Sequence, residues 1–115
     1  MSKTKIKEFL ANYNYDFIYK KKTESTMYDV QDYLKENNKN CICLSNQQSK
    51  GRGQRGNKWL SPPGNIYCSI SFDNLLDLKK HYVFSVLIAL SIKMSLEFFE
   101  AKNIYFKWPN DIFYK

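Results

Sequence analysis

The residues best suited to chemistry lie in one short segment, 47–64, which holds every glycine and every arginine of the chain. Its glycines let the backbone take positive φ and approach a ligand closely. Its two arginines, Arg52 and Arg55, lie among those glycines, and an arginine fork beside exposed backbone amides suits a carboxylate or a phosphate. Trp59 adds a flat apolar face on which a ring can stack. The pattern therefore indicates a loop that binds an anionic ligand.

Two other interpretations of this segment stay open at this point. Glycine and arginine together are also typical of a flexible RNA-binding loop, and of a surface loop without a ligand. A P-loop is excluded because the Gly-Lys-Ser/Thr ending is absent, and a Rossmann fingerprint because no helix is predicted to follow. The net charge of +7 adds little support for nucleic acid, because sixteen of the eighteen basic residues are lysines spread along the chain.

Hydrophobic periodicity predicts a mixture of helices and strands that must position this loop. Helices are predicted over residues 5–13, 26–38 and 78–101, and strands over 15–20, 41–45, 66–72, 104–108 and 112–114. Thr26 followed by Asp29 fits a capping box at the start of the second helix. At 115 residues, 43% of them hydrophobic, the chain suits one domain or a piece of one. These elements predict an α+β or α/β fold, a mixed sheet with helices packed on it.

The longest predicted helix, 78–101, carries apolar residues at three- and four-residue steps, which predicts one broad packing face. These positions are Val83, Phe84, Leu87, Leu90, Met94 and Phe98. The longest unbroken apolar run of the chain, 86–90, is far shorter than the roughly 20 residues that span a bilayer. Neither a membrane segment nor a signal peptide is therefore expected.

The cysteines indicate a reduced protein. Their number is odd, and Cys41 and Cys43 alternate like strand residues with no histidine or further cysteine nearby. That spacing does not make a zinc site. A cytoplasmic protein fits this pattern best.

Three motifs, taken together, resemble those of biotin protein ligases. Residues 51–59, followed by Ser61-Pro62 and the strand 65–72, resemble the biotin-binding loop of that family. Residues 24–27 resemble its acidic-Ser-Thr-Asn segment at a helix start, and residues 107–111 match its Lys-Trp-Pro-Asn-Asp motif. Each motif is short, but the three in this order are specific, and they cover the chain from about residue 15 to its end.

The resemblance implies the class II synthetase-like catalytic fold of biotin and lipoate ligases, and a reaction in two steps. Biotin's carboxylate attacks the α-phosphorus of ATP, with Mg²⁺, to give biotinyl-5'-AMP and pyrophosphate. A lysine of a biotin carboxyl carrier domain then attacks the mixed anhydride and releases AMP. This chemistry needs charge neutralisation and orientation of two reactants rather than a nucleophile on the enzyme.

The resemblance also assigns roles by position. It implies that Ser25, Thr26 and Gln48 bind the ureido ring of biotin, and that Arg52 holds its carboxylate and the adenylate phosphate. The full biotin-binding set is Ser25, Thr26, Met27, Gln48, Gly51, Arg52, Gly53 and Gln54. The nucleotide-binding set is Arg55, Trp59, Asn110 and Asp111, while Arg52, Lys107 and Asp111 are expected to act in catalysis and no resident metal is expected. The plainer alternatives are helix caps for Ser25 and Thr26, a solvated loop amide for Gln48, a core tryptophan for Trp59 and a turn residue for Asp111.

Two positions depart from the family pattern. Met27 stands where asparagine is usual, which removes one side-chain hydrogen bond, and Gln54 stands where many members have a second arginine. Lone His81 matches no family position and is expected at the surface.

The sequence resembles one partial catalytic domain over residues 1–115. Family members continue after the last motif with a lysine-bearing segment and a small β-barrel domain, and some begin with a DNA-binding helix-turn-helix. We therefore expect that the chain does not complete biotin transfer unaided, and that a complementing C-terminal fragment or self-association is involved. An inactive remnant of a ligase and a basic RNA- or DNA-binding module are the alternatives; lipoate ligases rank lower because their arginine motif differs.

Overall fold

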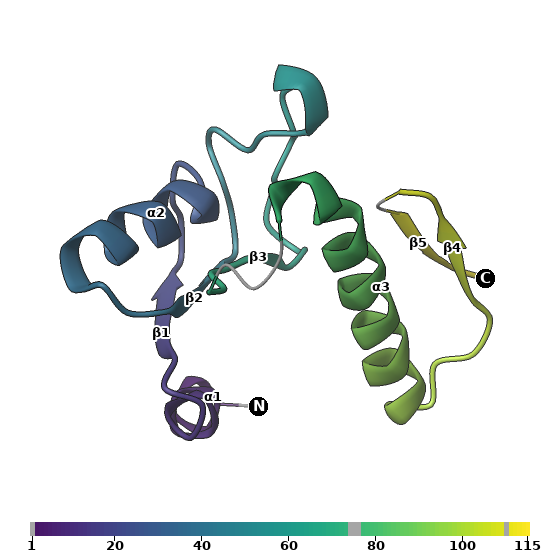
Figure 1. Cartoon of the computed structure of the whole chain (residues 1–115), viewed down its shortest axis with the longest axis horizontal. Coiled ribbons are helices and arrows are strands. Elements are labelled where there is room, and N and C mark those ends of the chain that lie inside the picture. The colour runs from purple at the N-terminus through teal and green to yellow at the C-terminus, as the bar shows by residue number, and fades with distance from the viewer. Residues whose placement is uncertain (1, 74–76, 110) are drawn as a thin grey trace. The chain divides into compact units, whose positions relative to one another are not determined.

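The structure is a computed structural model that describes residues 2–73, 77–109 and 111–115. It divides into two compact units, Met1–Asp73 and Asn74–Lys115 (Figure 1). Unit 1 contains a three-stranded sheet with two helices, and unit 2 contains a long helix with a strand hairpin. The assignment of the whole chain to a single domain stays a prediction.

The sheet of unit 1 is mixed, as the sequence predicted. β1 (Asp16–Lys20) pairs in parallel with β2 (Cys41–Ser45), and β2 pairs antiparallel with β3 (Tyr67–Ile70). β2 is the central strand. Its side chains alternate between the two faces of the sheet, so that Cys41, Cys43 and Ser45 all point to the same, buried face.

Two helices accompany this sheet. α1 (Lys3–Ala11) contacts β1, and α2 (Thr26–Asn37) crosses over the sheet to connect the parallel strands β1 and β2. A parallel pair requires such a crossover. α2 is capped by Asn38, whose amide still bonds to the Leu34 carbonyl and whose left-handed backbone (φ 47°) ends the helix. The small core lies between α2 and the sheet, and its members are Val30, Cys41 and Cys43, with Ile18, Tyr33 and Leu34 packed against them.

The predicted capping box at the start of α2 is wrong. The N-cap is Ser25, whose side chain makes no capping hydrogen bond, and Thr26 is already the first helical residue. The Thr26 amide instead donates to the side chain of Gln48, in the segment that follows β2 (2.9 Å). Asp29 does not bond back to the helix start because Lys20 and Thr23 donate to its carboxylate.

Unit 2 consists of a short 3-10 turn (Leu78–Lys80), α3 (His81–Phe98) and the antiparallel hairpin of β4 (Ile104–Lys107) and β5 (Asp111–Tyr114). α3 is shorter than the predicted 78–101. It ends three residues early because Glu100 takes a left-handed conformation (φ 65°). The Glu100 and Ala101 amides then bond back to the Glu97 and Leu96 carbonyls, which is the pattern of a Schellman cap.

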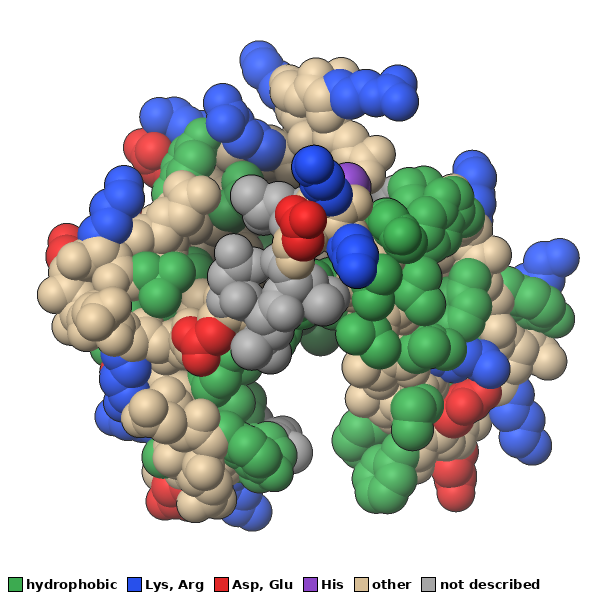
Figure 2. Space-filling view, in the orientation of Figure 1, with side chains coloured by type: hydrophobic (Ala, Val, Ile, Leu, Met, Phe, Trp, Pro, Cys, Tyr) green, Lys and Arg blue, Asp and Glu red, His purple; other side chains and the backbone are tan. Residues whose placement is uncertain are grey.

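The apolar face predicted for the long helix lies only in part against the hairpin, where Leu90 lines a pocket with Phe106 and Trp108. Small side chains on α3, Ser85 and Ala89, line a pocket with Pro109 and Ile112. Four of the predicted positions are exposed, namely Leu87, Leu90, Met94 and Phe98. Figure 2 shows hydrophobic side chains gathered over α3. By length and composition this helix also meets the minimum for a membrane span, a test that core helices of soluble proteins pass as well.

Candidate functional site

The segment rich in glycine and arginine forms a paired arm rather than an irregular loop. At its base the Gln48 amide donates to the Ser61 carbonyl (3.1 Å), and further out the Trp59 amide donates to the Gly51 carbonyl (2.9 Å). Near its tip the Gly53 amide donates to the Asn57 carbonyl (2.7 Å). The tip is a short 3-10 turn, Gln54–Gly56, and basic side chains project around it (Figure 2).

Gly51 lies where the two sides of this arm come closest. It is buried, and a Cβ added there would lie 2.5 Å from both the Ser61 hydroxyl and the Trp59 carbonyl oxygen. No real Cβ atom tolerates such contacts, so the close pairing of the arm needs glycine at this position. At Gly53, by contrast, an added Cβ would make only ordinary contacts of 3.5 Å or more.

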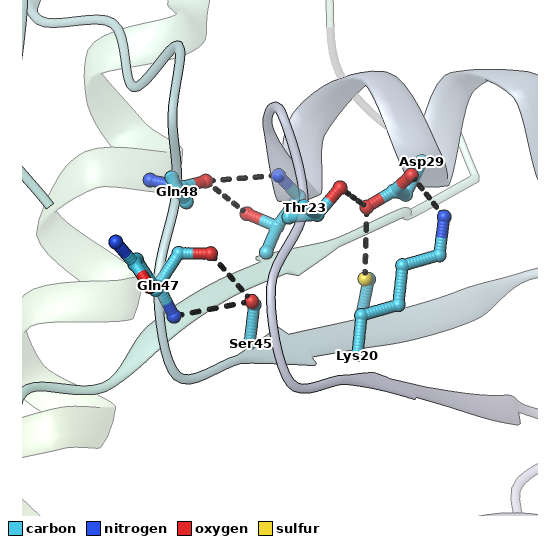
Figure 3. A network of polar contacts seen from close by, with 8 residues as sticks. Lys20, Thr23, Asp29, Ser45, Gln47 and Gln48 are labelled. Carbon is cyan, nitrogen blue, oxygen red and sulfur yellow. Dashed lines mark hydrogen bonds and ion pairs between the residues drawn. The ribbon is translucent and has the colours of Figure 1, made fainter. Parts of the chain in front are cut away.

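The base of the arm is joined to the start of α2 through side chains. Gln48 Oε1 accepts hydrogen bonds from the Thr26 amide (2.9 Å) and the Thr26 hydroxyl (3.1 Å), as Figure 3 shows. Gln48 Nε2 donates to the Ser61 hydroxyl (3.1 Å), and the Thr26 hydroxyl also bonds to that of Ser69 on β3 (2.8 Å). The structure thus brings Thr26 and Gln48 together, and it adds Ser61 and Ser69, which were not assigned roles from the sequence.

A first pocket opens beside this network, with a volume of about 270 Å³. Ser25 lies at its edge, only 3% exposed, and its side chain makes no hydrogen bond to any residue that the structure describes. Polar and apolar groups share the lining, which consists of Ser25, Thr26, Met27, Gln48, Arg52, Trp59, Ile66, Tyr67, Cys68 and Ser69. A pocket with a few convergent polar groups on apolar walls is typical of a small-molecule site.

A second pocket, about 420 Å³ in volume, lies along the arm and is more basic. Its lining includes Lys50, Arg52, Lys58 and Trp59 from the arm and Tyr28 from α2. The Arg52 guanidinium lies 5.6 Å from the centre of the Tyr28 ring, within reach of a cation–π attraction. Tyr28 was not singled out from the sequence, since a tyrosine on a half-buried helix face carries no distinctive signal.

Arg52 and Trp59 line both pockets, so these two side chains lie at their junction. Gln48 lines the first pocket and Gly51 the second, whereas three other predicted residues of the arm line neither. Gln54 and Arg55 lie at the exposed tip, where Arg55 has a left-handed backbone (φ 57°). Neither they nor Gly53 line the two pockets.

The described residues of the Lys-Trp-Pro-Asn-Asp motif lie in the hairpin of unit 2. Lys107 ends β4 and pairs with Asp111 at the start of β5. With Trp108 and Pro109 they line a largely apolar pocket of about 250 Å³ against α3. Asn110, predicted to bind nucleotide, lies outside the described residues.

Next to the turn that leads into α2, the carboxylate of Asp29 is paired. Asp29 accepts hydrogen bonds from Lys20 (2.6 Å) and from the Thr23 hydroxyl (2.6 Å). Burial alone raises the pKa of Asp29, but these hydrogen bonds outweigh it, so the pKa lies below its ordinary value. The Asp29 hydrogen bond correspondingly raises the pKa of Lys20. Both groups are therefore charged at neutral pH.

Comparison with known proteins agrees with the geometry. The sequence model of the Biotin/lipoate A/B protein ligase family matches residues 17–115. The chain belongs to this family. The bifunctional ligase/repressor BirA of Escherichia coli is 31% identical over 91 residues, which cover 78% of this chain, and the biotin–protein ligase of Homo sapiens is 32% identical over 80 residues.

Solved structures of biotin protein ligases share the fold. That of Aquifex aeolicus, in complex with biotin and ATP, matches with a TM-score of 0.69 and 31% identity over 86% of this chain. That of Leishmania major, in complex with biotin, matches with a TM-score of 0.66 and 28% identity over 88% of this chain. The predicted fold class and the resemblance to biotin protein ligases are confirmed. The chain spans 41% and 46% of those two chains and 28% of the E. coli relative.

Proposed function

We propose that this chain binds biotin in the first pocket and takes part in the two-step reaction of a biotin protein ligase. In the first step, a carboxylate oxygen of biotin bonds to the α-phosphorus of ATP and the bond to the β-phosphate bridge breaks, which releases pyrophosphate. In the second, a lysine amine of a biotin carboxyl carrier domain attacks the acyl carbon. An amide forms, the amine loses a proton and AMP leaves.

The observation that carries this proposal is the position of Arg52 at the junction of the two pockets. A biotin ring in the first pocket extends its valeryl chain and carboxylate toward that junction. A guanidinium there can bind both the carboxylate and the phosphate to which it becomes joined, and charge-assisted pairs of this kind are among the strongest hydrogen bonds. Lys50 and Lys58 add positive charge along the second pocket, on the side proposed for the nucleotide.

The first pocket suits a bicyclic ring with a urea group. Ser25 offers a hydroxyl that has no partner among the described residues, and Gln48 Nε2 retains one N–H beyond the one given to Ser61. Hydroxyl and amide groups can donate to a urea oxygen, and a hydroxyl can also accept from a urea N–H. Trp59, Ile66 and Tyr67 supply apolar walls for the ring's hydrocarbon and sulfur.

Other roles rest on the family resemblance. Lys107 and Asp111 are proposed to act on the nucleotide, and Gly51, Gly53 and Gln54 to offer arm groups to biotin or its adenylate. Among the described residues no three His, Cys, Asp or Glu side chains gather as a metal site. We propose that Mg²⁺ arrives with ATP, since this ion is usually held by substrate phosphates and one or two carboxylates. A cytoplasmic location is part of the same proposal.

The test is binding, followed by the two half-reactions separately. Biotinyl-5'-AMP at 100 times its Kd should stabilise the chain by about 2.7 kcal/mol in thermal unfolding. Arg52→Ala should weaken that binding by about 1.5–3 kcal/mol, the worth of a hydrogen bond to a charged group. Pyrophosphate release and labelling of a carrier domain, followed with biotin, ATP and Mg²⁺, report the two steps.

The matched control is Lys35→Ala, which removes one positive charge from the exposed far end of α2. It should bind the adenylate as the wild type does. No melting shift with biotinyl-5'-AMP, together with a clear shift with an RNA oligonucleotide, would contradict the proposal and favour a nucleic-acid-binding module. Equal, salt-dependent losses in both variants would point the same way.

A further inference from the structure

We infer that Asp29 is a positioning residue for the biotin pocket, because with Lys20 and Thr23 it clamps the β1–α2 turn that carries Ser25 and Thr26. This inference rests on the proposed function. We call these three residues the Asp29 clasp. The sequence singles out Asp29 only for a capping box that the structure does not form, and in the structure it lines none of the pockets described above.

The hydrogen bonds of the clasp are short, and its carboxylate is shielded although Lys20 is 46% exposed. The Asp29 side chain is 13% exposed, and each of its two oxygens receives one strong donor, Lys20 Nζ at Oδ1 and Thr23 Oγ1 at Oδ2, both at 2.6 Å. The thiol of Cys43 lies 3.7 Å from Oδ2 and faces the same carboxylate from the central strand. Figure 3 shows these groups converging on Asp29. One carboxylate thus joins the end of β1, the turn after it, α2 and β2.

The turn held by the clasp is in direct contact with the arm. The Thr23 amide donates to the Gln47 carbonyl (3.1 Å), and the Ser49 amide donates back to the Thr23 carbonyl (2.9 Å). The Lys50 amide donates to the Glu24 carbonyl (2.8 Å). Two residues of the turn are therefore paired with three of the four residues that precede Gly51.

A second set of hydrogen bonds, from the sheet, holds the same contact between the turn and the arm. The buried Ser45 hydroxyl, at the end of β2, donates to the Gln47 carbonyl (2.8 Å), which also accepts the Thr23 amide. Gln48, the next residue, reaches the start of α2 through Thr26. If Asp29 releases Thr23, the turn can move relative to Gln47, and the polar edge of the first pocket moves with it. Asp29 therefore acts on ligand binding through other residues.

The experiment compares Asp29→Asn with Asp32→Asn. Asp32 lies on the same helix, is exposed, and makes no hydrogen bond or ion pair within 4 Å among the described residues. An asparagine at position 29 keeps the shape but can no longer accept from both donors as a charged group. We expect Asp29→Asn to weaken biotin binding, measured by calorimetry, about 10-fold, or ~1.4 kcal/mol, and Asp32→Asn to leave it unchanged.

Hydrogen exchange separates positioning from a general loss of stability. In Asp29→Asn the amides of residues 49 and 50, which bond to the turn, should exchange faster, while those of β2 keep their protection. Thr23→Val should weaken binding similarly, and the double variant should lose no more than the larger single loss, since both break one interaction. Wild-type affinity in Asp29→Asn, or an equal loss in Asp32→Asn, would overturn the inference.

Results that refute the proposed function can be distinguished from results that refute the clasp. A wild-type chain that binds neither biotin nor its adenylate would refute the ligand and, with it, the role of Asp29 in binding. Exchange of residues 49 and 50 needs no ligand, so unchanged protection there in Asp29→Asn refutes the clasp whether or not biotin binds.

Discussion

Replacing Gly51 by alanine tests the close pairing on which the whole arm depends. The new methyl group would lie 2.5 Å from the Trp59 carbonyl oxygen and 2.5 Å from the Ser61 hydroxyl. The hydroxyl can rotate away, but the carbonyl belongs to the backbone and already faces this position. The two sides of the arm must therefore separate, which strains the nearby hydrogen bond between the Trp59 amide and the Gly51 carbonyl.

The expected cost follows from these contacts. Inserting a methyl group into a packed site usually costs about 1–3 kcal/mol. In a domain of this size each kcal/mol lowers Tm by about 4–8 °C. Because Gln48 Nε2 would also be 3.2 Å from the new carbon, the disturbance reaches the first pocket. Affinity for biotinyl-5'-AMP should fall together with stability.

The matched control is Gly53→Ala, two residues further along the same arm. There the backbone has φ −93°, which any residue adopts, and an added Cβ finds only ordinary contacts. Urea unfolding and thermal unfolding of both variants, with and without biotinyl-5'-AMP, provide the measurement. Gly51→Ala with the stability of Gly53→Ala would refute the argument, because it would mean that the arm is not paired as closely as described.

Three further predictions concern the groups around the arm. Thr26→Val removes the hydroxyl that bonds to Gln48 and Ser69 and should lower the free energy of unfolding in urea by about 1–3 kcal/mol. The control is Thr4→Val, at an exposed position of α1. An equal effect of both changes would contradict the network. Cys41 and Cys43 are fully buried, and burial next to Asp29 raises the pKa of Cys43 to about 12. In the native chain, iodoacetamide at pH 8 should therefore modify the exposed Cys68 first. Mass spectrometry that finds Cys43 modified as fast as Cys68 would refute this. The pKa of Asp29 is lowered in the folded state, so its stabilising effect is present above the unfolded pKa of about 4 and is lost as pH falls through the lower folded pKa. The difference in unfolding free energy between wild type and Asp29→Asn, measured in urea, should therefore shrink from pH 7 to pH 3. A constant difference would count against the pairing.

Most helices and strands, and the family of the chain, could be predicted from local sequence patterns. The alternation of apolar residues located the strands of unit 1 to within a few residues, and Asn37-Asn38 correctly marked the end of α2. The three motifs led to the right family because they record residue types and spacing directly. The C-terminal ends of helices were harder to predict. α3 stops at Phe98 through a left-handed Glu100, and a glutamate carries no sequence signal for that conformation.

Contacts between residues far apart in the chain could not be predicted from the sequence. The bond between Thr26 and Gln48 joins residues that are 22 positions apart, and that between Thr26 and Ser69 joins residues 43 apart. Both depend on β2 being the central strand, paired with β1 on one side and β3 on the other. Sequence patterns predict strands but not their order. The same reason hid the role of Asp29, whose partners Lys20 and Thr23 precede the helix instead of lying along it.

The position of Gln48 argues against one of the two roles that the sequence left open, that of a solvated loop amide, while its role as a ligand group stays a proposal. Its Oε1 is occupied, since it accepts two hydrogen bonds from Thr26 and so satisfies the first amide of α2. Its Nε2 has given one hydrogen to Ser61 and retains the other. Within the proposed function, Gln48 can therefore meet biotin only as a donor, toward the urea oxygen. The urea N–H groups then need an acceptor elsewhere in the pocket. Ser25 is well placed to be one, because it lines the pocket and its hydroxyl makes no hydrogen bond to any described residue.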